Sequence, residues 1–372
     1  MWHIYRQITA LHRVRPIVLA QKREQIERFP FEPVYLVGKP ATHFLRRFWF
    51  RQLLDEPWQI SRVELEALLQ ILNRSQARLL HIYFGHIAVH LLPLIRTWPQ
   101  PSIVSFHGAD VLVEMNKPAF RQATETMLGA VQRVLVRSSS LGKALTDLGC
   151  DPDRIAIVRT GIPLREFAFR ARSHPPDGAW RFLQACRLIP KKGLPTSLRA
   201  FALFVARHPE ATFQIAGEGP LLEELQNLAC QLGIEKQVRF LGLISQDQLR
   251  ELYYSSHAFL HPSETGRDGN QEGVPNSMLE AMATGLPVFA TTHGGIPEAV
   301  EHGVSGRLVP EGEHEALARA LLETVESPDS LAALARAGAE AVAQKFDQLT
   351  QVRRLEEIYL ETIAAAPPAD LP

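Results

Sequence analysis

The sequence predicts an α/β protein made of two successive doubly wound domains, and three observations support this. Short apolar runs rich in β-branched residues alternate with amphipathic helical stretches along the chain. The alternation starts again after a central segment rich in Pro, Gly and polar residues. The 372 residues are long for one domain and sufficient for two. Because the strands are apolar along most of their length, we expect parallel sheets with helices on both faces.

Residues 1–165 are predicted to form an N-terminal domain. Its helices are expected near 2–12, 43–54, 61–73, 86–96, 117–129 and 138–149. Its strand candidates are Pro16–Ala20, Pro33–Val37, Arg78–Ile82, Ser102–Phe106, Arg133–Val136 and Arg154–Val158. Two segments at strand ends carry conspicuous polar side chains, His81–His86 and Ser105–Asp110. Ligands of such sheets bind at the carboxyl ends of the strands, so both segments are candidates for ligand contact.

A second βα series follows a predicted linker at residues 166–178 and forms a C-terminal domain over residues 179–345. Its strands are expected at Phe182–Cys186, Thr212–Ala216, Val238–Leu241, Ala258–His261, Pro287–Ala290 and Gly306–Val309. Its longer helices are expected near 196–207, 221–231, 246–254, 313–325 and 329–344, and a last helix near 348–364. The residues beyond that helix are predicted to fray.

Composition narrows the class of protein. The chain is 46% hydrophobic and 22% charged, with a formal net charge of zero, so nothing indicates a nucleic-acid partner. Cys150, Cys186 and Cys230 are far apart and form no C-x-x-C, which indicates neither a disulfide framework nor a zinc site. The first residues lack the apolar core of a signal peptide, and no apolar run approaches the ~18–20 residues of a spanning helix. We therefore expect a soluble protein in a reducing cytoplasm.

The segment Asp268–Gly285 combines a polar, Gly-containing loop with the start of a short helix. Pro275 suits the first helical turn, and Gly285 suits a left-handed cap at the helix end. The backbone N–H groups of such a helix start favour an anion. Glu272 and Glu280 do not suit a phosphate, but they suit hydroxyl groups. The combination points to a ligand with both phosphates and hydroxyls, such as a nucleotide sugar. The alternative is a capped surface helix with two ordinary glutamates.

A basic loop, Arg187–Gly193, directly follows a predicted strand of the same sheet. Arg187 can bind phosphate oxygens in a fork, and Lys192 can add a movable charge, so together they could neutralise a diphosphate leaving group. A single basic loop is more often solvated surface. A binding site is favoured because the loops of this sheet carry Gly or cationic groups on one edge at 187–193, 217–220, 268–276 and 293–297.

These segments together resemble glycosyltransferase family 4, the retaining nucleotide-sugar transferases of GT-B architecture. The resemblance extends over nearly all of residues 130–345. It rests on R-x4-K-G at Arg187–Gly193, A-G-x-G-P at Ala216–Pro220, V-x-F-x-G at Val238–Gly242, E-x7-E at Glu272 and Glu280, G-G-x-P-E at Gly294–Glu298 and G-x-x-V-P at Gly306–Pro310. It implies two Rossmann-like domains that face each other across a cleft. It also implies a crossover helix, residues 346–364, that packs on the N-terminal domain.

The resemblance implies roles for individual residues. Arg187 and Lys192 would bind the donor diphosphate, Glu272 would hold hydroxyls of the donor sugar, and Glu280 would hold those of the ribose. The base would lie against Gly242, Leu243 and Ile244, and the amides of Gly273 and Val274 would lie near the sugar or phosphate. The candidates for donor binding are completed by Gly219, Pro275, Asn276 and Ser277. His107 matches a histidine that touches the donor sugar, so the catalytic candidates are His107, Arg187, Lys192 and Glu272.

The first half departs from the family pattern. Members usually open with a strand and a Gly-rich loop near the donor phosphates, whereas this sequence begins at what looks like the following helix, Trp2–Ile8. The usual N-G-x-D at the hinge is Thr160–Pro163 here. The missing strand puts in doubt either the start of the chain or the N-terminal domain's share of diphosphate binding. The segments His81–His86 and His107–Asp110 are similar to those of the family members that build bacterial exopolysaccharides and other surface glycans.

Residues 1–60 carry ten Lys or Arg against five Asp or Glu. Within them, residues 44–54 interleave aromatic and aliphatic side chains with Arg46, Arg47 and Arg51. This pattern suits a helix that lies on an anionic membrane, at the inner face of the cytoplasmic membrane. The alternative is a core-facing helix with its arginines on the solvent side.

Two metal-like patterns are set aside. Asp151-Pro-Asp153 has the D-x-D spacing of another transferase class, but it falls in a helix-to-strand turn where Asp and Pro are common. His86 and His90 lie one helical turn apart without a third ligand. We expect no metal and no cofactor other than the donor.

The leading hypothesis is a metal-independent, retaining glycosyltransferase that uses a UDP- or GDP-linked hexose and a glycan or lipid-linked acceptor. The family has no settled protein nucleophile, and a front-face reaction is generally proposed. Two alternatives remain. One is an epimerase or phosphorylase on the same architecture. The other is a non-catalytic subunit that binds nucleotide sugar and acts as a scaffold.

Overall fold

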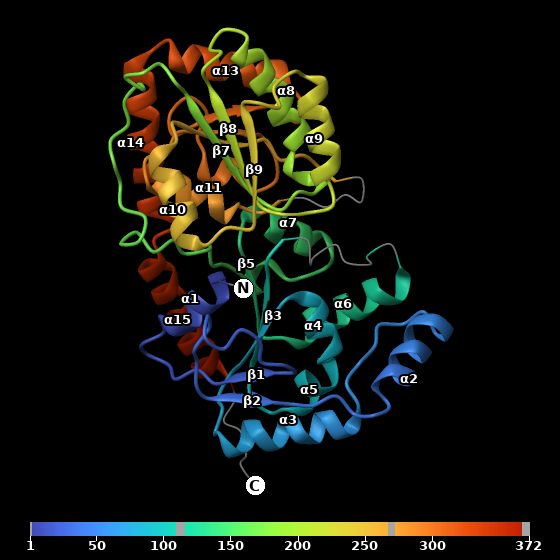
Figure 1. The fold of residues 1–372 in the computed structure, drawn as a ribbon. Helices are drawn as coiled ribbons and strands as arrows, with labels where there is room; N and C mark the ends of the chain where they lie inside the picture. The colour runs from blue at the N-terminus through green and yellow to red at the C-terminus, as the bar shows by residue number, and fades with distance from the viewer. Residues whose placement is uncertain (1, 109–114, 116, 267–271, 367–372) are drawn as a thin grey trace. The chain divides into compact units, whose positions relative to one another are not determined.

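The structure is a computed structural model that describes residues 2–108, 115, 117–266 and 272–366. The chain divides into two compact units, one of Met1–Gly161 with Leu349–Pro372 and one of Ile162–Gln348. Each unit holds a parallel β-sheet with helices on both of its faces (Figure 1). The predicted α/β class with two doubly wound domains is confirmed.

The main sheet of the first unit has the strand order β3-β4-β5-β6, with all strands parallel. Its strands are β3 (Leu80–Tyr83), β4 (Ser102–Phe106), β5 (Arg133–Val136) and β6 (Ile155–Ile157). β4 and β5 occupy the centre and are buried along almost their whole length, which explains why their sequences are apolar without alternation. Tyr83, His107 and Arg137 lie at or just beyond the carboxyl ends of these strands.

Five helices cover one face of this sheet and form its main core. They are α3 (Arg62–Arg74), α4 (Gly85–His90), α5 (Leu92–Thr97), α6 (Pro118–Ala130) and α7 (Ser139–Asp147). The single helix predicted over 86–96 is therefore wrong, because α4 ends at His90 and α5 begins at Leu92. Pro93 has no N–H for an i→i−4 hydrogen bond, so a new helix starts in front of it.

The last helix of the chain, α15 (Gln348–Ala365), covers the other face of the same sheet (Figure 1). Leu355, Ile358 and Tyr359 pack against Ile103 and Leu135 of the two central strands. The Glu356 carboxylate accepts hydrogen bonds from the backbone N–H groups of His12 and Arg13, at 2.6 and 2.5 Å. The end of the chain is thereby tied to its beginning within the first unit.

Two short strands, β1 (Val18–Ala20) and β2 (Val34–Leu36), pair with each other in a separate two-stranded parallel sheet. Neither strand contains a fully buried residue, which separates them from the apolar strands of the main sheet. The helix α1 (Trp2–Thr9) precedes them. The helix predicted over 43–54 is present as α2 (His43–Phe48), which continues into a π-helical stretch, η1 (Trp49–Leu53).

The sheet of the second unit has the strand order β12-β11-β10-β7-β8-β9, and all its strands are parallel. Its strands are β7 (Arg181–Ala185), β8 (Thr212–Ala216), β9 (Val238–Gly242), β10 (Ala258–His261), β11 (Val288–Thr291) and β12 (Arg307–Val309). From β7 the chain proceeds to one side through β8 and β9, and from β10 to the other side through β11 and β12. The loops after β7 and β10 therefore diverge at a topological switch point, where α/β sheets place their ligands.

Helices cover both faces of this second sheet (Figure 1). One layer contains α8 (Leu194–Val205), α9 (Leu222–Gln231) and α13 (His314–Val325). The other contains α10 (Gln246–Ser255), α11 (Asn276–Ala283), α12 (Ile296–Ala299) and α14 (Pro328–Lys345). Pro275 precedes α11 in an extended conformation, so the prediction that it lies in the first turn is wrong by one position. Gly285 has φ 81°, which agrees with the predicted left-handed cap.

Residues 166–178, predicted to be a linker, pack on the second unit, which begins at Ile162. Phe167 is buried in the core beside α11. The Arg172 guanidinium donates to the carbonyl oxygens of Tyr254 (2.8 Å), Tyr253 (3.0 Å) and Thr284 (3.1 Å). Carbonyls at helix C-termini lack partners within their own helix, and Arg172 supplies partners at the ends of α10 and α11.

Candidate functional site

A buried glutamine near the end of β7 shapes the loop that carries two lysines. Gln184 donates from Nε2 to the carbonyl oxygen of Lys192 (2.9 Å) and accepts from Ser197 Oγ (2.7 Å). Gly193 follows with φ 59°, and a Cβ there would lie 1.7 Å from the carbonyl oxygen of Pro262. Only glycine fits at this contact, which holds the loop after β7 against the loop after β10.

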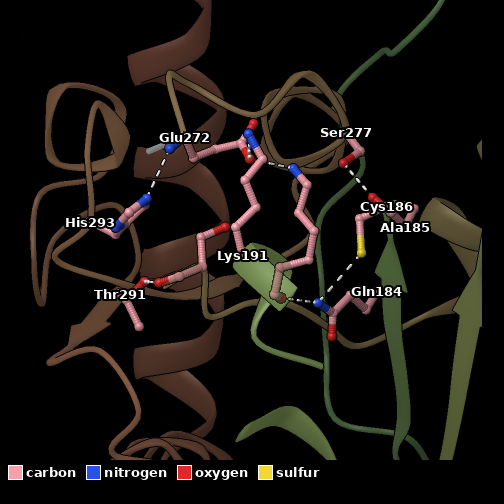
Figure 2. A network of polar contacts seen from close by, with 10 residues as sticks. Gln184, Ala185, Cys186, Lys191, Glu272, Ser277, Thr291 and His293 are labelled. Carbon is pink, nitrogen blue, oxygen red and sulfur yellow. Dashed lines mark hydrogen bonds and ion pairs between the residues drawn. The ribbon is translucent and has the colours of Figure 1, made fainter. Parts of the chain in front are cut away.

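Two lysines and one glutamate meet between these loops. Lys192 Nζ donates to Glu272 Oε2 at 2.6 Å, and Lys191 Nζ lies 3.6 Å from the same oxygen. The lysine side chains are each 10% exposed and that of Glu272 is 16% exposed. Figure 2 shows the Lys191 side chain reaching toward the Glu272 carboxylate. The sequence motifs predict Lys192 and Glu272 but not Lys191, because the family motif contains one lysine at this loop.

The electrostatics of this cluster favour an ionised carboxylate. Burial alone would raise the pKa of Glu272, but the charges of Lys192 and Lys191 outweigh it and lower the pKa to about 2. Burial also lowers the pKa of Lys191, and the charge of Glu272 partly opposes this. At neutral pH Glu272 can therefore only accept hydrogen bonds. Arg187 contributes to the lowered pKa of Lys191, so a third cation acts on the cluster.

The predicted residues Arg187 and Gly219 lie where the loops after β7 and β8 touch. Leu188 N donates to the carbonyl oxygen of Glu218 (2.9 Å), and Leu221 N donates to that of Leu188 (3.2 Å). A Cβ at Gly219 would lie 2.4 Å from the Leu188 carbonyl oxygen. The Arg187 side chain is exposed at this edge. Gly219 thus allows two loops to pack together, and Arg187 extends the positive edge into solvent.

The start of α11 is anchored to β7. Ser277 donates from Oγ to the carbonyl oxygen of Ala185 at 2.6 Å, as Figure 2 shows. Gly273 and Val274 lie in the connection between Glu272 and the helix, which starts at Asn276 without a side-chain cap. The structure therefore gives the Ser277 hydroxyl an anchoring contact. The first backbone N–H groups of α11 have no partner within the helix, as at every helix start.

Glu280 is buried in the second turn of α11, at 7% exposure. Its Oε2 accepts from the hydroxyl of Tyr253 (3.1 Å) and from Gln246 Nε2 (3.3 Å). Both donors belong to α10, which follows the loop after β9. The exposed side chain of Leu243 and the half-buried Ile244 follow Gly242 in that loop. The predicted ribose-binding carboxylate and the predicted base-binding stretch are therefore linked through α10.

The loop after β11 contributes a residue that no sequence motif predicts. His293 is buried, and its Nε2 accepts from the backbone N–H of Glu272 at 2.9 Å (Figure 2). Its Nδ1 lies 2.6 Å from Oε1 of Glu311. Gly294 has φ 53°, and a Cβ there would lie 2.0 Å from the Glu272 carbonyl oxygen. The predicted loop 293–297 thus packs directly on Glu272, although no sequence signal identified His293 or Glu311.

A second constellation lies within the first unit, around His107. Ser105 Oγ lies 3.0 Å from His107 Nε2, and Arg137 Nε donates to His107 Nδ1 at 3.4 Å. Arg137 is buried and also donates to the carbonyl oxygen of Val158 at 3.0 Å. Burial, followed by the charge of Arg137, places the pKa of His107 well below its usual range. His107 is therefore a neutral imidazole at physiological pH.

The segment His81–His86 divides between the interior and the surface. The His81 ring packs against Tyr83, and its Nδ1 lies 2.5 Å from the Tyr359 hydroxyl of α15. Burial lowers the pKa of His81 to about 3. His86 is exposed at the start of α4, with its ring centroid 5.9 Å from that of Phe84. His86 is thus the more exposed of the two histidines in this segment.

The sequence-predicted residues form two groups, one in each unit. Arg187, Lys192 and Glu272 come together in the second unit, with Glu280 and the Gly242–Ile244 loop linked to them through α10 and α11. His107 belongs to the first unit. Asp110, the last residue of the H-G-x-D motif, and Asp268–Gln271 of the polar loop lie outside the described residues.

The two motifs with metal-like spacing, Asp151–Asp153 and His86 with His90, contain side chains that contact neighbouring parts of the protein. The Asp151 carboxylate accepts from the backbone N–H of Asp153 at 3.0 Å and begins a turn of 3-10 helix. The His90 ring stacks on Trp58, with centroids 3.9 Å apart, and its Nδ1 lies 3.0 Å from the Trp58 carbonyl oxygen. Within the described part of the chain, no three His, Cys, Asp or Glu residues gather as a metal-binding group.

Comparison with known protein families gives a match in each half of the chain. Residues 166–341 match the family described as glycosyl transferases group 1. Residues 2–166 match the family described as glycosyltransferase family 4. The two matches together cover nearly the whole chain and agree with the resemblance that the motifs indicated.

Similar proteins carry related descriptions. The amylovoran biosynthesis glycosyltransferase AmsK of Erwinia amylovora is 31% identical over 293 residues, which cover 77% of this chain and 70% of AmsK. WcaL of Salmonella typhimurium, named as a colanic acid biosynthesis glycosyltransferase, is 33% identical over 259 residues, 69% of this chain and 63% of WcaL. Among solved structures, Anabaena HepE in complex with UDP has a TM-score of 0.78 at 19% identity, with 96% of each chain covered.

Proposed function

The chain belongs to glycosyltransferase family 4, whose hexosyltransferases include those of bacterial exopolysaccharides, and on this premise we propose that it moves a hexose from a UDP- or GDP-linked donor to a glycan or lipid-linked acceptor. The product would be a polysaccharide or glycolipid. The observation that supports this activity most directly is the contact of Glu272 with Lys192 and Lys191 at the switch point of the second sheet.

The lysine–glutamate cluster suits a ligand that is anionic at one end and hydroxylated at the other. Lys191 and Lys192 would turn from Glu272 to the diphosphate, with Arg187 adding a forked contact. Glu272 is ionised and would accept hydrogen bonds from hydroxyl groups of the sugar. As the glycosidic bond breaks, negative charge grows on the leaving diphosphate, and the same cations stabilise it most at that point.

The remaining donor contacts follow from the helices beside this cluster. Glu280, oriented by Tyr253 and Gln246, would accept from the ribose hydroxyls. The base would lie along Gly242–Ile244. The first-turn amides of α11 would complete the phosphate site. The cations supply the charge neutralisation that a divalent metal supplies in other transferases, so we propose a reaction that needs no metal.

His107 is proposed to contact the donor sugar as a neutral imidazole. Burial and the neighbouring charge of Arg137 keep the ring unprotonated, so it can act as a hydrogen-bond partner without adding a positive charge. We propose a retaining, front-face reaction in which the leaving phosphate takes the proton of the acceptor hydroxyl, as is generally proposed for the family.

We also propose that residues 44–54 bind an anionic membrane at the cytoplasmic face, where a lipid-linked acceptor would be presented. Six apolar side chains of this segment are between 46% and 75% exposed: Phe44, Leu45, Phe48, Trp49, Leu53 and Leu54. Arg47 lies among them, and its charge suits anionic headgroups. No helix in the described residues is long and apolar enough to cross a bilayer, so the proposed contact is peripheral.

A screen of nucleotide sugars tests the proposed activity. A donor that binds the folded protein raises its melting temperature by mass action, so one or more UDP or GDP hexoses are expected to do so. The donor identified is then used in a transfer assay with lipid and glycan acceptors. Absence of a shift with any UDP, GDP or ADP sugar, together with absence of transfer, would refute the proposal.

A further inference from the structure

Glu272 is held by its main chain as well as by its side chain. His293 Nε2 accepts from the backbone N–H of Glu272 (2.9 Å), and Gly295 N donates to the backbone carbonyl oxygen of Glu272 (3.2 Å). Lys192 Nζ holds the carboxylate itself, at 2.6 Å from Oε2. The position of the carboxylate therefore depends on two residues of the loop after β11 that are not expected to touch a donor themselves.

The contacts of His293 determine its tautomer. A backbone N–H can only donate, so the Nε2 that faces Glu272 must be unprotonated. The ring proton is then on Nδ1, which lies 2.6 Å from Glu311 Oε1 and donates to it. A carboxylate on one ring nitrogen thus fixes the other nitrogen as an acceptor, as occurs for metal-bound histidines.

Glu311 is well placed to accept the hydrogen bond from His293 Nδ1–H. Burial would raise the pKa of its carboxyl group, but the hydrogen bonds from His293 and from the backbone N–H of Thr265 outweigh it and lower the pKa. Glu311 Oε2 accepts from Thr265 N at 2.7 Å. Thr265 and Glu272 belong to the same connection between β10 and α11. One carboxylate therefore holds two points of the connection that carries the sugar-binding candidate.

We propose that His293 and Glu311 are positioning residues that hold the main chain of Glu272 where its carboxylate receives the donor sugar. This inference rests on the proposed role of Glu272. Neither residue touches the donor, and both act through the Glu272 backbone. The affinity contributed by the sugar part of the donor should therefore depend on His293 and Glu311. The affinity for the nucleoside diphosphate, which the lysines, Arg187 and Glu280 would bind, should depend on them little.

Matched variants at His293 test this directly. His293→Leu removes the acceptor and leaves the partly buried Glu272 N–H without it. His293→Gln places a carbonyl oxygen near the position of Nε2 and keeps the acceptor. Calorimetric titration is done with UDP-glucose and UDP, and with GDP-mannose and GDP. His293→Leu is expected to weaken binding of the nucleotide sugar about tenfold or more and of the nucleoside diphosphate less than about twofold. His293→Gln should restore most of the sugar-dependent affinity.

A double-mutant cycle with Glu272→Ala separates positioning from a general effect on the fold. In that background the carboxylate is absent, so His293→Leu should weaken nucleotide-sugar binding no further. Equal weakening of the nucleotide sugar and the nucleoside diphosphate, or fully additive losses in the cycle, would overturn the inference. Glu311→Ala is expected to act like His293→Leu, and Glu311→Gln, which keeps an acceptor for Nδ1–H, to lose less.

A measurement without ligand distinguishes failure of this inference from failure of the proposed function. Hydrogen exchange of the Glu272 backbone N–H, followed in a peptide that begins several residues before Glu272, should become faster in His293→Leu and return toward the wild-type rate in His293→Gln. If wild-type protein binds no nucleotide sugar, the proposed function fails, and the exchange rates still decide whether His293 holds the Glu272 main chain. Unchanged exchange in His293→Leu would contradict the inference whatever the protein binds.

Discussion

Lys192 and Glu272 are 80 positions apart in the chain, and their side chains form a 2.6 Å ion pair. Each follows a different strand of the second sheet, β7 for the lysine and β10 for the glutamate. These strands are neighbours at the point where the direction of chain winding reverses. The pair thus lies at the topological switch point, where α/β sheets place their ligands.

Replacement of Glu272 by Ala should reduce transfer by at least about 100-fold, because it removes the contacts proposed between this carboxylate and the reacting sugar. The fold should persist, since the two lysines of the cluster can reach solvent by moving their long side chains. Transfer is measured with the donor from the screen, and folding by circular dichroism. Turnover at the wild-type rate in Glu272→Ala would disprove the assignment of this site.

Replacement of Lys192 by Met should both abolish transfer and destabilise the second unit. Met keeps the apolar stem but leaves Glu272 with Lys191 alone at 3.6 Å, so the free energy of unfolding should fall by about 1–3 kcal/mol. The pKa of Glu272 should rise toward its ordinary value. Lys236→Met, a change outside the cluster, serves as the control. A stability equal to wild type in Lys192→Met would show that the ion pair contributes nothing to folding.

Replacement of Tyr253 by Phe should raise the KM for the donor about five- to tenfold with a smaller change in kcat. The variant loses the hydroxyl that donates to Glu280 at 3.1 Å, and a loss of about 1–1.4 kcal/mol, typical of one hydrogen bond, corresponds to a five- to tenfold change. Tyr254→Phe is the matched control, because its hydroxyl donates to the Ala168 carbonyl oxygen and not to Glu280. Equal effects of the two substitutions would argue against a role for Glu280 in donor binding.

Stability should decrease as the pH falls from about 6.5 toward 3. Burial and the charge of Arg137 lower the pKa of His3 and of His81 from 6.5 to about 3 in the folded protein. In this window the unfolded chain binds protons that the folded chain does not, so each histidine removes up to about 1.4 kcal/mol per pH unit. Thermal unfolding is followed between pH 7.5 and 4.5. His81→Gln should show a shallower decline, and an identical decline would contradict this attribution.

Membrane binding should depend on the exposed apolar residues of α2 and η1. Leu45→Glu combined with Phe48→Glu should weaken co-sedimentation with phosphatidylglycerol vesicles about tenfold or more. Neutral phosphatidylcholine vesicles should bind even the wild-type protein more weakly. Leu203→Glu, at an exposed leucine of α8 in the second unit, is the control. Equal binding of the double variant and the wild type would refute a membrane contact through residues 44–54.

Much of the fold was predictable because its signals are local. The strands Ser102–Phe106, Arg133–Val136, Thr212–Ala216 and Ala258–His261 were predicted with their observed bounds. A buried parallel strand needs apolar residues on both faces, so its sequence alone marks it. The break between α4 and α5 was missed because apolar periodicity continues across Pro93. The separate sheet of β1 and β2 was also missed, since strand pairing is not a property of either strand alone.

The sequence by itself determined the family, the succession of strands and helices, and the motifs that carry Arg187, Lys192, Glu272 and Glu280. Those features depend on the residue types and their spacing over a few neighbouring positions, so they can be recognised without the structure. Only the tertiary structure decided that Lys191 shares the Glu272 carboxylate, and that His293 and Glu311 hold its main chain. It also decided that residues 166–178 pack on the second unit through Arg172. The order of strands in the sheet brings these partners together. A hydrogen bond between residues far apart in the chain produces no periodic pattern, so the sequence alone does not predict it.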